Sequence, residues 1–238
     1  TGKASTRNSA FFLQDEIGLA KGWQLSLAGR YDHASTFGSH FSPKVYLVAQ
    51  TSDMLTIKGG YSTAFKAPDP YQLSPEYKVV SCGGRCMLSG NPDLKPETSR
   101  NAELGLVLSG KLWNVSLVAF HNQIQDMIIA YYDAAAAKRR WVNIEKAKTR
   151  GVELEASWRP LATLELRGNY TRLIADGTDA AGNTAPLEGR PDHSLQMQAL
   201  WQVSTPLSVS LAAHYNGRQQ AEGQQLGGYM RYDAALQY

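Results

Sequence analysis

The sequence predicts an all-β fold: a transmembrane antiparallel up-and-down β-barrel, with about eleven strands in this chain. Three observations predict it. Apolar and polar residues alternate with period two along most of the 238 residues, short and long connections alternate between the strands, and four of the five tryptophans fall at one end of them. No apolar run approaches the roughly 18 residues of a membrane helix, so strands would have to cross the membrane.

Each strand is assigned from its alternation, in which one face is apolar and the other polar. In the segment 152–158, Val152 and Leu154 alternate with Glu153 and Glu155. The same pattern predicts strands at 23–31, 55–62, 101–108, 164–170, 195–203, 207–215 and 230–238, with a further strand before the turn at 20–22. The segments 43–50 and 112–126 alternate less regularly, and we allow a bulge in either of them.

The connections differ in length according to the end of the sheet at which they lie. Short turns are expected near 20–22, 51–53, 109–111, 159–161 and 204–206, and long connections at 32–42, 65–97, 130–145, 175–192 and 218–228. In a meander, every short turn then lies at one end of the sheet and every long loop at the other. Outer-membrane β-barrels have this arrangement, with short periplasmic turns and long extracellular loops.

Four tryptophans support this orientation. Trp23 and Trp113 follow short turns, whereas Trp158 and Trp201 precede them. A ring of aromatic residues at the short-turn end matches the interfacial girdle of a membrane barrel. The polar strand faces fit either a soluble sandwich or a barrel with a wet or plugged lumen, but isolated aromatic residues in a sandwich core would not have to share one end. The girdle and the unequal loops therefore favour the barrel.

Charge and motif content argue against other classes of function. The net charge is only +3, with Lys and Arg scattered along the chain, so we expect no nucleic-acid partner. No nucleophile elbow, P-loop or paired-carboxylate signature occurs, and the chain is not expected to be an enzyme. The five histidines show no metal-ligand spacing, so neither a metal site nor a resident cofactor is expected.

Several motifs resemble those of one membrane-protein family. The segments "GYSTAFKAP" (60–68) and "GNPDLKPETS" (90–99) resemble the paired boxes of TonB-dependent outer-membrane receptors. The segment "NIEKAKTRGVELEASW" (143–158) resembles the family's "N…A…GVE" strand, and "GGYMRYDAALQY" (227–238) resembles a late barrel strand. Within the family, the pattern is most similar to the branch of catecholate-siderophore and colicin I receptors.

The resemblance implies a barrel of about 22 strands that encloses an N-terminal plug domain. We therefore expect residues 1–238 to form part of one receptor β-barrel domain, the middle-to-late portion of it, and to contain no plug domain. Two open sheet edges would leave backbone groups unsatisfied in a bilayer, which indicates that the chain belongs to a larger barrel. The expected location is the outer membrane of a Gram-negative cell.

The connection 65–97 contains both cysteines of the chain. Cys82 and Cys86 enclose Gly-Gly-Arg, a spacing that fits either half of a metal site or a local disulfide. No other cysteine exists, no histidine lies between 68 and 90, and the cell-surface setting implied by the resemblance is oxidising, so we favour the disulfide, with Arg85 presented outward. The missing histidine also argues against haem, because haem receptors of this family typically carry one between the two boxes.

Two long connections contain the residue types that a ferric tris-catecholate requires. This ligand is a compact trianion with aromatic faces, so cations would meet its charge and aromatic rings would cover the catechol planes. The candidate ligand-binding residues are Tyr71, Tyr77, Lys78, Arg85, Tyr131, Tyr132, Arg139 and Arg140. The alternative is that the basic residues contact lipopolysaccharide and the tyrosines form an outer girdle. Siderophore oxygens would hold the iron, so no protein metal ligands are expected.

The expected function is import of a ferric siderophore, of the catecholate type, by a TonB-dependent receptor. The implied partners are the ferric siderophore, TonB with its inner-membrane energising complex acting through an N-terminal region outside this chain, outer-membrane lipid and lipopolysaccharide, and colicin. A receptor for haem, cobalamin or another chelate is the alternative within transport. A passive porin or an adhesion barrel is the alternative from another class.

Overall fold

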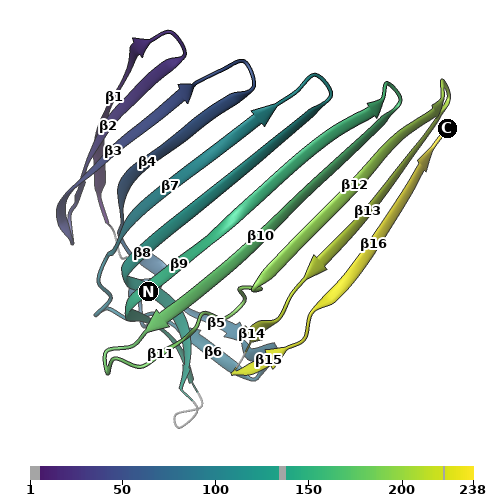
Figure 1. The fold of residues 1–238 in the computed structure, drawn as a ribbon. Helices are drawn as coiled ribbons and strands as arrows, with labels where there is room; N and C mark the ends of the chain where they lie inside the picture. The colour runs from purple at the N-terminus through teal and green to yellow at the C-terminus, as the bar shows by residue number, and fades with distance from the viewer. Residues whose placement is uncertain (1–5, 134–137, 222) are drawn as a thin grey trace.

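One antiparallel sheet dominates the computed structural model, which describes residues 6–133, 138–221 and 223–238. Its eleven main strands follow one another in chain order, as the ribbon in Figure 1 shows, and this confirms the predicted up-and-down strand arrangement. They are β1 (Asn8–Ala20), β2 (Trp23–Ala34), β3 (Gly38–Gln50), β4 (Leu55–Lys66), β7 (Glu97–Ser109), β8 (Trp113–Asp133), β9 (Lys138–Leu161), β10 (Leu164–Thr178), β12 (His193–Ser204), β13 (Leu207–Asn216) and β16 (Tyr229–Gln237).

Shorter elements occupy the connections at the end opposite the short turns. They are α1 (Pro70–Leu73), β5 (Lys78–Ser81), the 3-10 turn η1 (Cys82–Gly84), β6 (Cys86–Ser89), β11 (Thr184–Pro186), β14 (Gln219–Ala221) and β15 (Gln224–Leu226). Figure 1 draws β5 and β6 behind the main sheet. Among the described residues, no helix has the length and hydropathy to span a membrane.

Two of the expected long loops are instead strand extensions. At 32–42, β2 continues to Ala34 and β3 begins at Gly38, which leaves a tight turn. At 130–145, β8 continues to Asp133 and β9 begins at Lys138; residues 134–137 lie outside the described part. Alternation fails to reveal these extensions because 32–42 is mostly polar and the apolar residues 127–132 are consecutive, while the backbone groups of both hairpins still pair with each other.

Register along the sheet is regular where we allowed bulges. The pairings of segments 43–50 and 112–126 show no register shift, although Asp126 has a positive φ of 53° inside β8. Shifts occur instead beside short turns, between Gly18 and Ala20 in β1 and between Gln202 and Ser204 in β12, for example. The irregular alternation of these two segments therefore comes from the order of their polar and apolar residues and not from an inserted residue.

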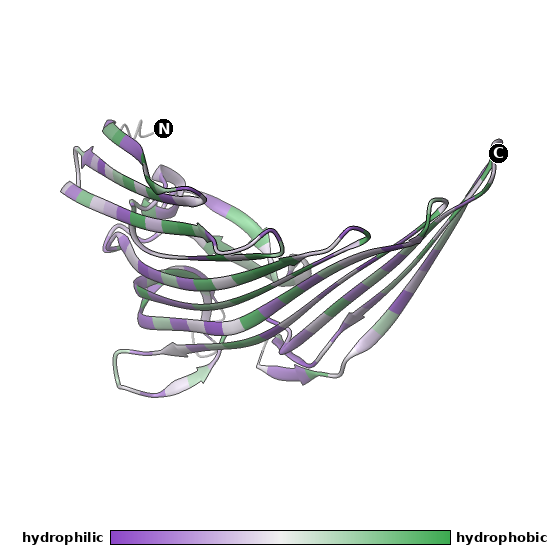
Figure 2. Cartoon of the chain, turned by 45° about the horizontal axis from the view of Figure 1, so that its top comes forward, coloured by the Kyte–Doolittle hydropathy of each residue, from purple (hydrophilic) through white to green (hydrophobic). Residues whose placement is uncertain are grey.

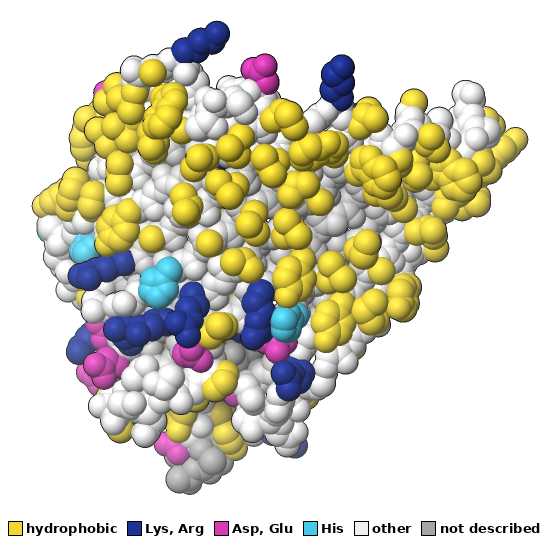
Figure 3. Space-filling model, in the orientation of Figure 1, with side chains coloured by type: hydrophobic (Ala, Val, Ile, Leu, Met, Phe, Trp, Pro, Cys, Tyr) yellow, Lys and Arg dark blue, Asp and Glu magenta, His cyan; other side chains and the backbone are white. Residues whose placement is uncertain are grey.

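The sheet is a single curved layer with two faces of different polarity, and Figure 2 shows the hydropathy changing from residue to residue along its strands. One face is apolar and uncovered: Leu104, Leu154 and Leu211 are all exposed, and Figure 3 shows hydrophobic side chains spread over it. Among the described residues, no large side chain is fully buried. A soluble sandwich would cover this apolar face with a second layer, whereas a barrel wall presents it to lipid.

The opposite face carries charged side chains in pairs. The Glu165 carboxylate accepts a hydrogen bond of 2.6 Å from Arg167 and one of 3.1 Å from Arg159. The Tyr46 hydroxyl of β3 donates to Glu103 of β7 at 2.8 Å, across the intervening strand β4. A continuous polar face of this kind matches the lumen side of a barrel wall.

The predicted tryptophan ring is present at the short-turn end. Trp113 of β8 and Trp158 of β9 pair directly across the two strands, and Trp23 and Trp201 lie beside their own short turns. All four side chains are exposed. The ring therefore borders the apolar face at one end, as an interfacial girdle does.

Candidate functional site

The connection between β4 and β7 lies against the extended β8–β9 hairpin. The ring centroids of Tyr71 and Trp141 are 6.2 Å apart in an edge-on arrangement, and those of Tyr71 and Tyr77 are 5.5 Å apart. In addition, β6 pairs in parallel with β9, with Leu88 opposite Arg139. Two segments that sequence reasoning treated as separate loops are thus one structural unit.

The short helix α1 is fixed at its start and tied to the second box. The buried Gln72 side chain accepts a 2.9 Å hydrogen bond from the Asp69 backbone NH, and the Gln72 carbonyl accepts one of 2.6 Å from the Asn91 NH. A Cβ atom on Gly90 would collide with the backbone of Ser74. Only glycine allows this close approach, which explains the glycine that opens the box "GNPDLKP".

Asn143 makes three side-chain hydrogen bonds, two of which hold the same box against the hairpin. Its Oδ1 accepts from the Lys95 NH at 2.8 Å, and its Nδ2 donates to the Lys95 carbonyl at 3.0 Å and to the Asp126 carbonyl at 2.6 Å. The Asn91 amide also donates to the Trp141 carbonyl at 3.0 Å. We call the four residues Gln72, Gly90, Asn91 and Asn143 the loop base.

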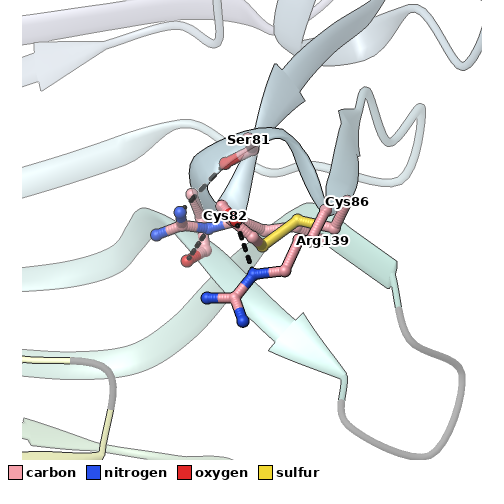
Figure 4. The surroundings of a disulfide bond; sticks show 6 residues. Ser81, Cys82, Cys86 and Arg139 are labelled. Atoms are coloured by element: carbon pink, nitrogen blue, oxygen red, sulfur yellow. Dashed lines mark hydrogen bonds between the residues drawn. A yellow bond between two sulfur atoms is a disulfide. The ribbon is translucent and has the colours of Figure 1, made fainter.

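The tip of the connection contains a disulfide between Cys82 and Cys86, whose Cα atoms are 5.4 Å apart. Figure 4 shows Ser81 and Arg139 beside it. The Arg139 Nη1 donates a 3.0 Å hydrogen bond to the Ser81 hydroxyl, which links the tip to β9. Because guanidinium has five N–H donors, Arg139 keeps donors for a further partner.

The four predicted ligand residues of the β8–β9 hairpin lie on two faces of it. Tyr132 is directly opposite Arg139, and Tyr131 is directly opposite Arg140. Since successive residues of a strand point to opposite faces, Arg139 and Tyr132 share the face of Trp141, which contacts the β4–β7 connection. Arg140 and Tyr131 lie on the other face, so the structure does not bring all four together.

The remaining predicted ligand residues lie at the surface of the connection. Tyr71 and Tyr77 are exposed and in ring contact, Lys78 begins β5, and the exposed Arg85 makes a long 3.4 Å hydrogen bond to the Cys82 carbonyl. Partial desolvation and the Asp69 carboxylate raise the pKa of the Tyr71 hydroxyl above its ordinary value. Tyr71 is therefore a neutral phenol at physiological pH, able to donate a hydrogen bond.

Sequence reasoning missed the loop base, although one signal for it was present. Gly90, Asn91 and Asn143 all fall inside the segments that resemble family boxes, but the side chains of Asn91 and Asn143 bond to backbone groups about 50 positions away in the chain. Within the described ranges, no group of three or more His, Cys, Asp or Glu side chains could hold a metal ion. The chemistry of this site is cationic, phenolic and aromatic.

A protein-family model described as "TonB dependent receptor-like, beta-barrel" matches residues 1–238. The chain belongs to the TonB-dependent receptor family. It is 38% identical over 229 residues to the iron-regulated outer membrane virulence protein of Vibrio cholerae, covering 90% of this chain and 34% of that protein. It is 30% identical to the ferric enterobactin receptor PirA of Pseudomonas aeruginosa, covering 92% of this chain and 31% of that one.

A solved structure gives the same result. Residues 1–238 match a variant of the ferric enterobactin receptor PfeA of Pseudomonas aeruginosa, solved in complex with enterobactin. The TM-score is 0.76 and the identity is 27%, and the match covers 94% of this chain and 36% of that one. The chain thus spans about a third of the length of these relatives. The resemblance to siderophore receptors drawn from the boxes is confirmed, as is the outer membrane as the location of this receptor barrel.

In this receptor, titration with a thiol reagent of the denatured but unreduced protein is expected to find no free cysteine, because Cys82 and Cys86 are joined. Prior reduction should release two thiols. The double variant Cys82→Ser/Cys86→Ser should become more sensitive to limited proteolysis between β5 and β6, since the cross-link restricts the conformations of the tip. Ser39→Ala, a hydroxyl change at the tip of another hairpin, serves as a control. Two free thiols before reduction would contradict the pairing.

Proposed function

We propose that the chain is the loop-bearing barrel portion of an outer-membrane receptor that imports a ferric siderophore of the catecholate type. One observation carries the proposal: the β4–β7 connection and the β8–β9 hairpin join into a unit that presents Tyr71, Tyr77, Trp141 and Arg139 near one another. Aromatic rings and a cation in one place suit a trianion with aromatic faces. The relative whose structure contains enterobactin supports this ligand class.

Within this proposal, the iron remains bound by the siderophore, and the receptor contributes no metal ligand, resident cofactor or catalytic group. Residues 1–238 would be part of a single barrel domain. TonB and its inner-membrane energising complex would act through a part of the receptor outside these residues. Lipopolysaccharide would contact the outer wall, and a colicin could use the exposed β5–β6 tip, where Val80 and Met87 are uncovered.

The proposal is tested by fluorescence-quenching titration of the complete receptor. The ligands are a trianionic ferric tris-catecholate, an uncharged ferric tris-hydroxamate, haem and cobalamin. We expect the catecholate to bind at least about tenfold more tightly than the others, because the loss of charge-assisted hydrogen bonds costs about 1.5–3 kcal/mol. Preference for the hydroxamate, haem or cobalamin would overturn the choice of ligand.

Uptake of radioiron from the same ferric catecholate distinguishes a receptor from a passive barrel. Cells that contain the complete receptor should accumulate the label only while their inner membrane is energised. A protonophore should therefore abolish uptake without reducing surface binding. Uptake that continues after de-energisation would indicate a porin, and binding without any uptake would indicate an adhesion barrel.

A further inference from the structure

A cavity of about 200 Å³ lies on the apolar face of the sheet, away from the candidate siderophore site. It is formed by β8, β9, β10 and the short strand β11, which folds back onto β10. Its lining residues are His121, Lys148, Arg150, Asp176, Thr178 and Thr184. The cavity could hold several water molecules, at about 30 Å³ each, and therefore also a phosphate group.

The lining side chains belong to the same face as the apolar wall. His121 is directly opposite Arg150, and it follows Leu117 and Ala119 at the two-residue spacing of one strand face. On the next pair of strands, Lys148 of β9 is directly opposite Asp176 of β10. In Figure 3, Lys, Arg and His side chains gather in a row along the loop-side edge of the hydrophobic face. The cavity therefore opens outward, toward the membrane surface rather than the lumen.

The two cations of the cavity have no partner in the described part of the chain. Neither Lys148 nor Arg150 makes a hydrogen bond or ion pair there. By contrast, the Arg172 guanidinium on the next strand is 3.7 Å from the Asp192 carboxylate. Thr178 and Thr184 are hydrogen-bonded to each other at 3.1 Å, which leaves one hydroxyl proton free to donate. The cavity thus offers several unused donors.

The height of the cavity fits the polar surface of the outer leaflet. Lys148 lies ten residues beyond Trp158 along β9, which is about 33 Å of strand. With the usual barrel tilt of about 35–45°, this places Lys148 about 23–27 Å above the tryptophan ring, close to the height of about 25 Å of a barrel's apolar band. A lipid whose acyl chains cover Leu117 and Leu154 would place its headgroup at this cavity.

We propose that this cavity is a binding site for a phosphorylated glycolipid of the outer leaflet, with Lys148 and Arg150 binding the phosphate of its headgroup. The paired donors of Arg150 and the point charge of Lys148 suit a phosphate. The Asp176 carboxylate would repel a second phosphate but can accept hydrogen bonds from sugar hydroxyls, which favours a phosphosugar over a plain phospholipid. The inference depends on the outer-membrane location and not on siderophore import.

The test uses the complete receptor in detergent and measures binding of bisphosphorylated lipid A by native mass spectrometry. Lys148→Ala/Arg150→Ala should weaken this binding about thirtyfold, at about fivefold for each cation lost near a lipid headgroup. Phosphate-free lipid A should bind wild type and variant equally weakly. The charge-conserving variant Lys148→Arg/Arg150→Lys should retain most of the binding.

The matched control is Lys21→Ala/Lys111→Ala, which removes two exposed cations at the short-turn end and should leave lipid binding unchanged. Each variant's folded state is checked by its heat-modifiable gel mobility, and its affinity for a ferric catecholate should equal that of wild type. Unchanged lipid binding in Lys148→Ala/Arg150→Ala, or an equal loss in the control, would overturn the site. Displacement of the lipid by millimolar inorganic phosphate would assign the site to free phosphate instead.

Discussion

Replacing Asn143 by alanine is expected to detach the β4–β7 connection from the β8–β9 hairpin while the barrel wall stays folded. The change removes three hydrogen bonds, two to Lys95 and one to Asp126. The bond to Asp126 lies within the hairpin, whereas the two to Lys95 join the hairpin to the connection. At about 0.5–1.5 kcal/mol each, these two stabilise the docked connection by about 1–3 kcal/mol. The affinity for a ferric siderophore should fall at least about tenfold, because a ligand then binds only the docked fraction.

Hydrogen exchange of the complete receptor measures the same event without any ligand. In Asn143→Ala, the backbone amides of 90–96 should exchange faster, and those of the main sheet should not. Asn143→Asp should be no better, because a carboxylate cannot donate to the two carbonyl oxygens. Asn122→Ala is the matched control: it removes a single amide bond, to Thr149 at 3.1 Å on the same two strands. Unchanged exchange in Asn143→Ala would show that the loop base does not hold the connection.

The wall of the barrel could be predicted from the sequence because each main strand carries its own signal. Val152 to Trp158 alternates with Glu153 to Ser157, and the same residues form the two faces of β9. The interfacial tryptophans mark the short-turn end of the barrel wall. This information is local, since a lipid-facing side chain needs no specific partner. The strand extensions at 32–42 and 130–145 escaped prediction because neither segment alternates: the first is mostly polar, and in the second the apolar residues 127–132 are consecutive.

The loop base and the outer cavity could not be predicted in the same way because both depend on contacts distant in sequence. Asn143 meets Lys95 only when β9 lies beside the end of the β4–β7 connection. The cavity brings His121 of β8 together with Thr184 of β11. Residue types alone marked Arg139 and Arg140 as equivalent, whereas strand alternation places them on opposite faces. The pairing of strands, rather than composition, separates their roles.

Arg139→Ala is accordingly expected to weaken binding of a trianionic ferric catecholate by about tenfold to a hundredfold, and Arg140→Ala by much less. Arg139 shares its face with Trp141 and Tyr132, and its hydrogen bond to Ser81 orients the guanidinium. A charge-assisted hydrogen bond to a ligand contributes about 1.5–3 kcal/mol, which gives the expected range. Fluorescence quenching of the complete receptor measures both variants.

Charge and position are separated by three further measurements. Arg139→Lys keeps the charge but loses the fork that reaches Ser81, so it should restore only part of the affinity. Ser81→Ala removes the orienting hydroxyl and leaves the cation, and a small loss is expected. An uncharged ferric hydroxamate should bind Arg139→Ala and wild type alike, since the missing interaction is with ligand charge. If Arg140→Ala weakens catecholate binding as much as Arg139→Ala does, the ligand must contact both faces of the hairpin. The site would then not be confined to the face that contacts the β4–β7 connection.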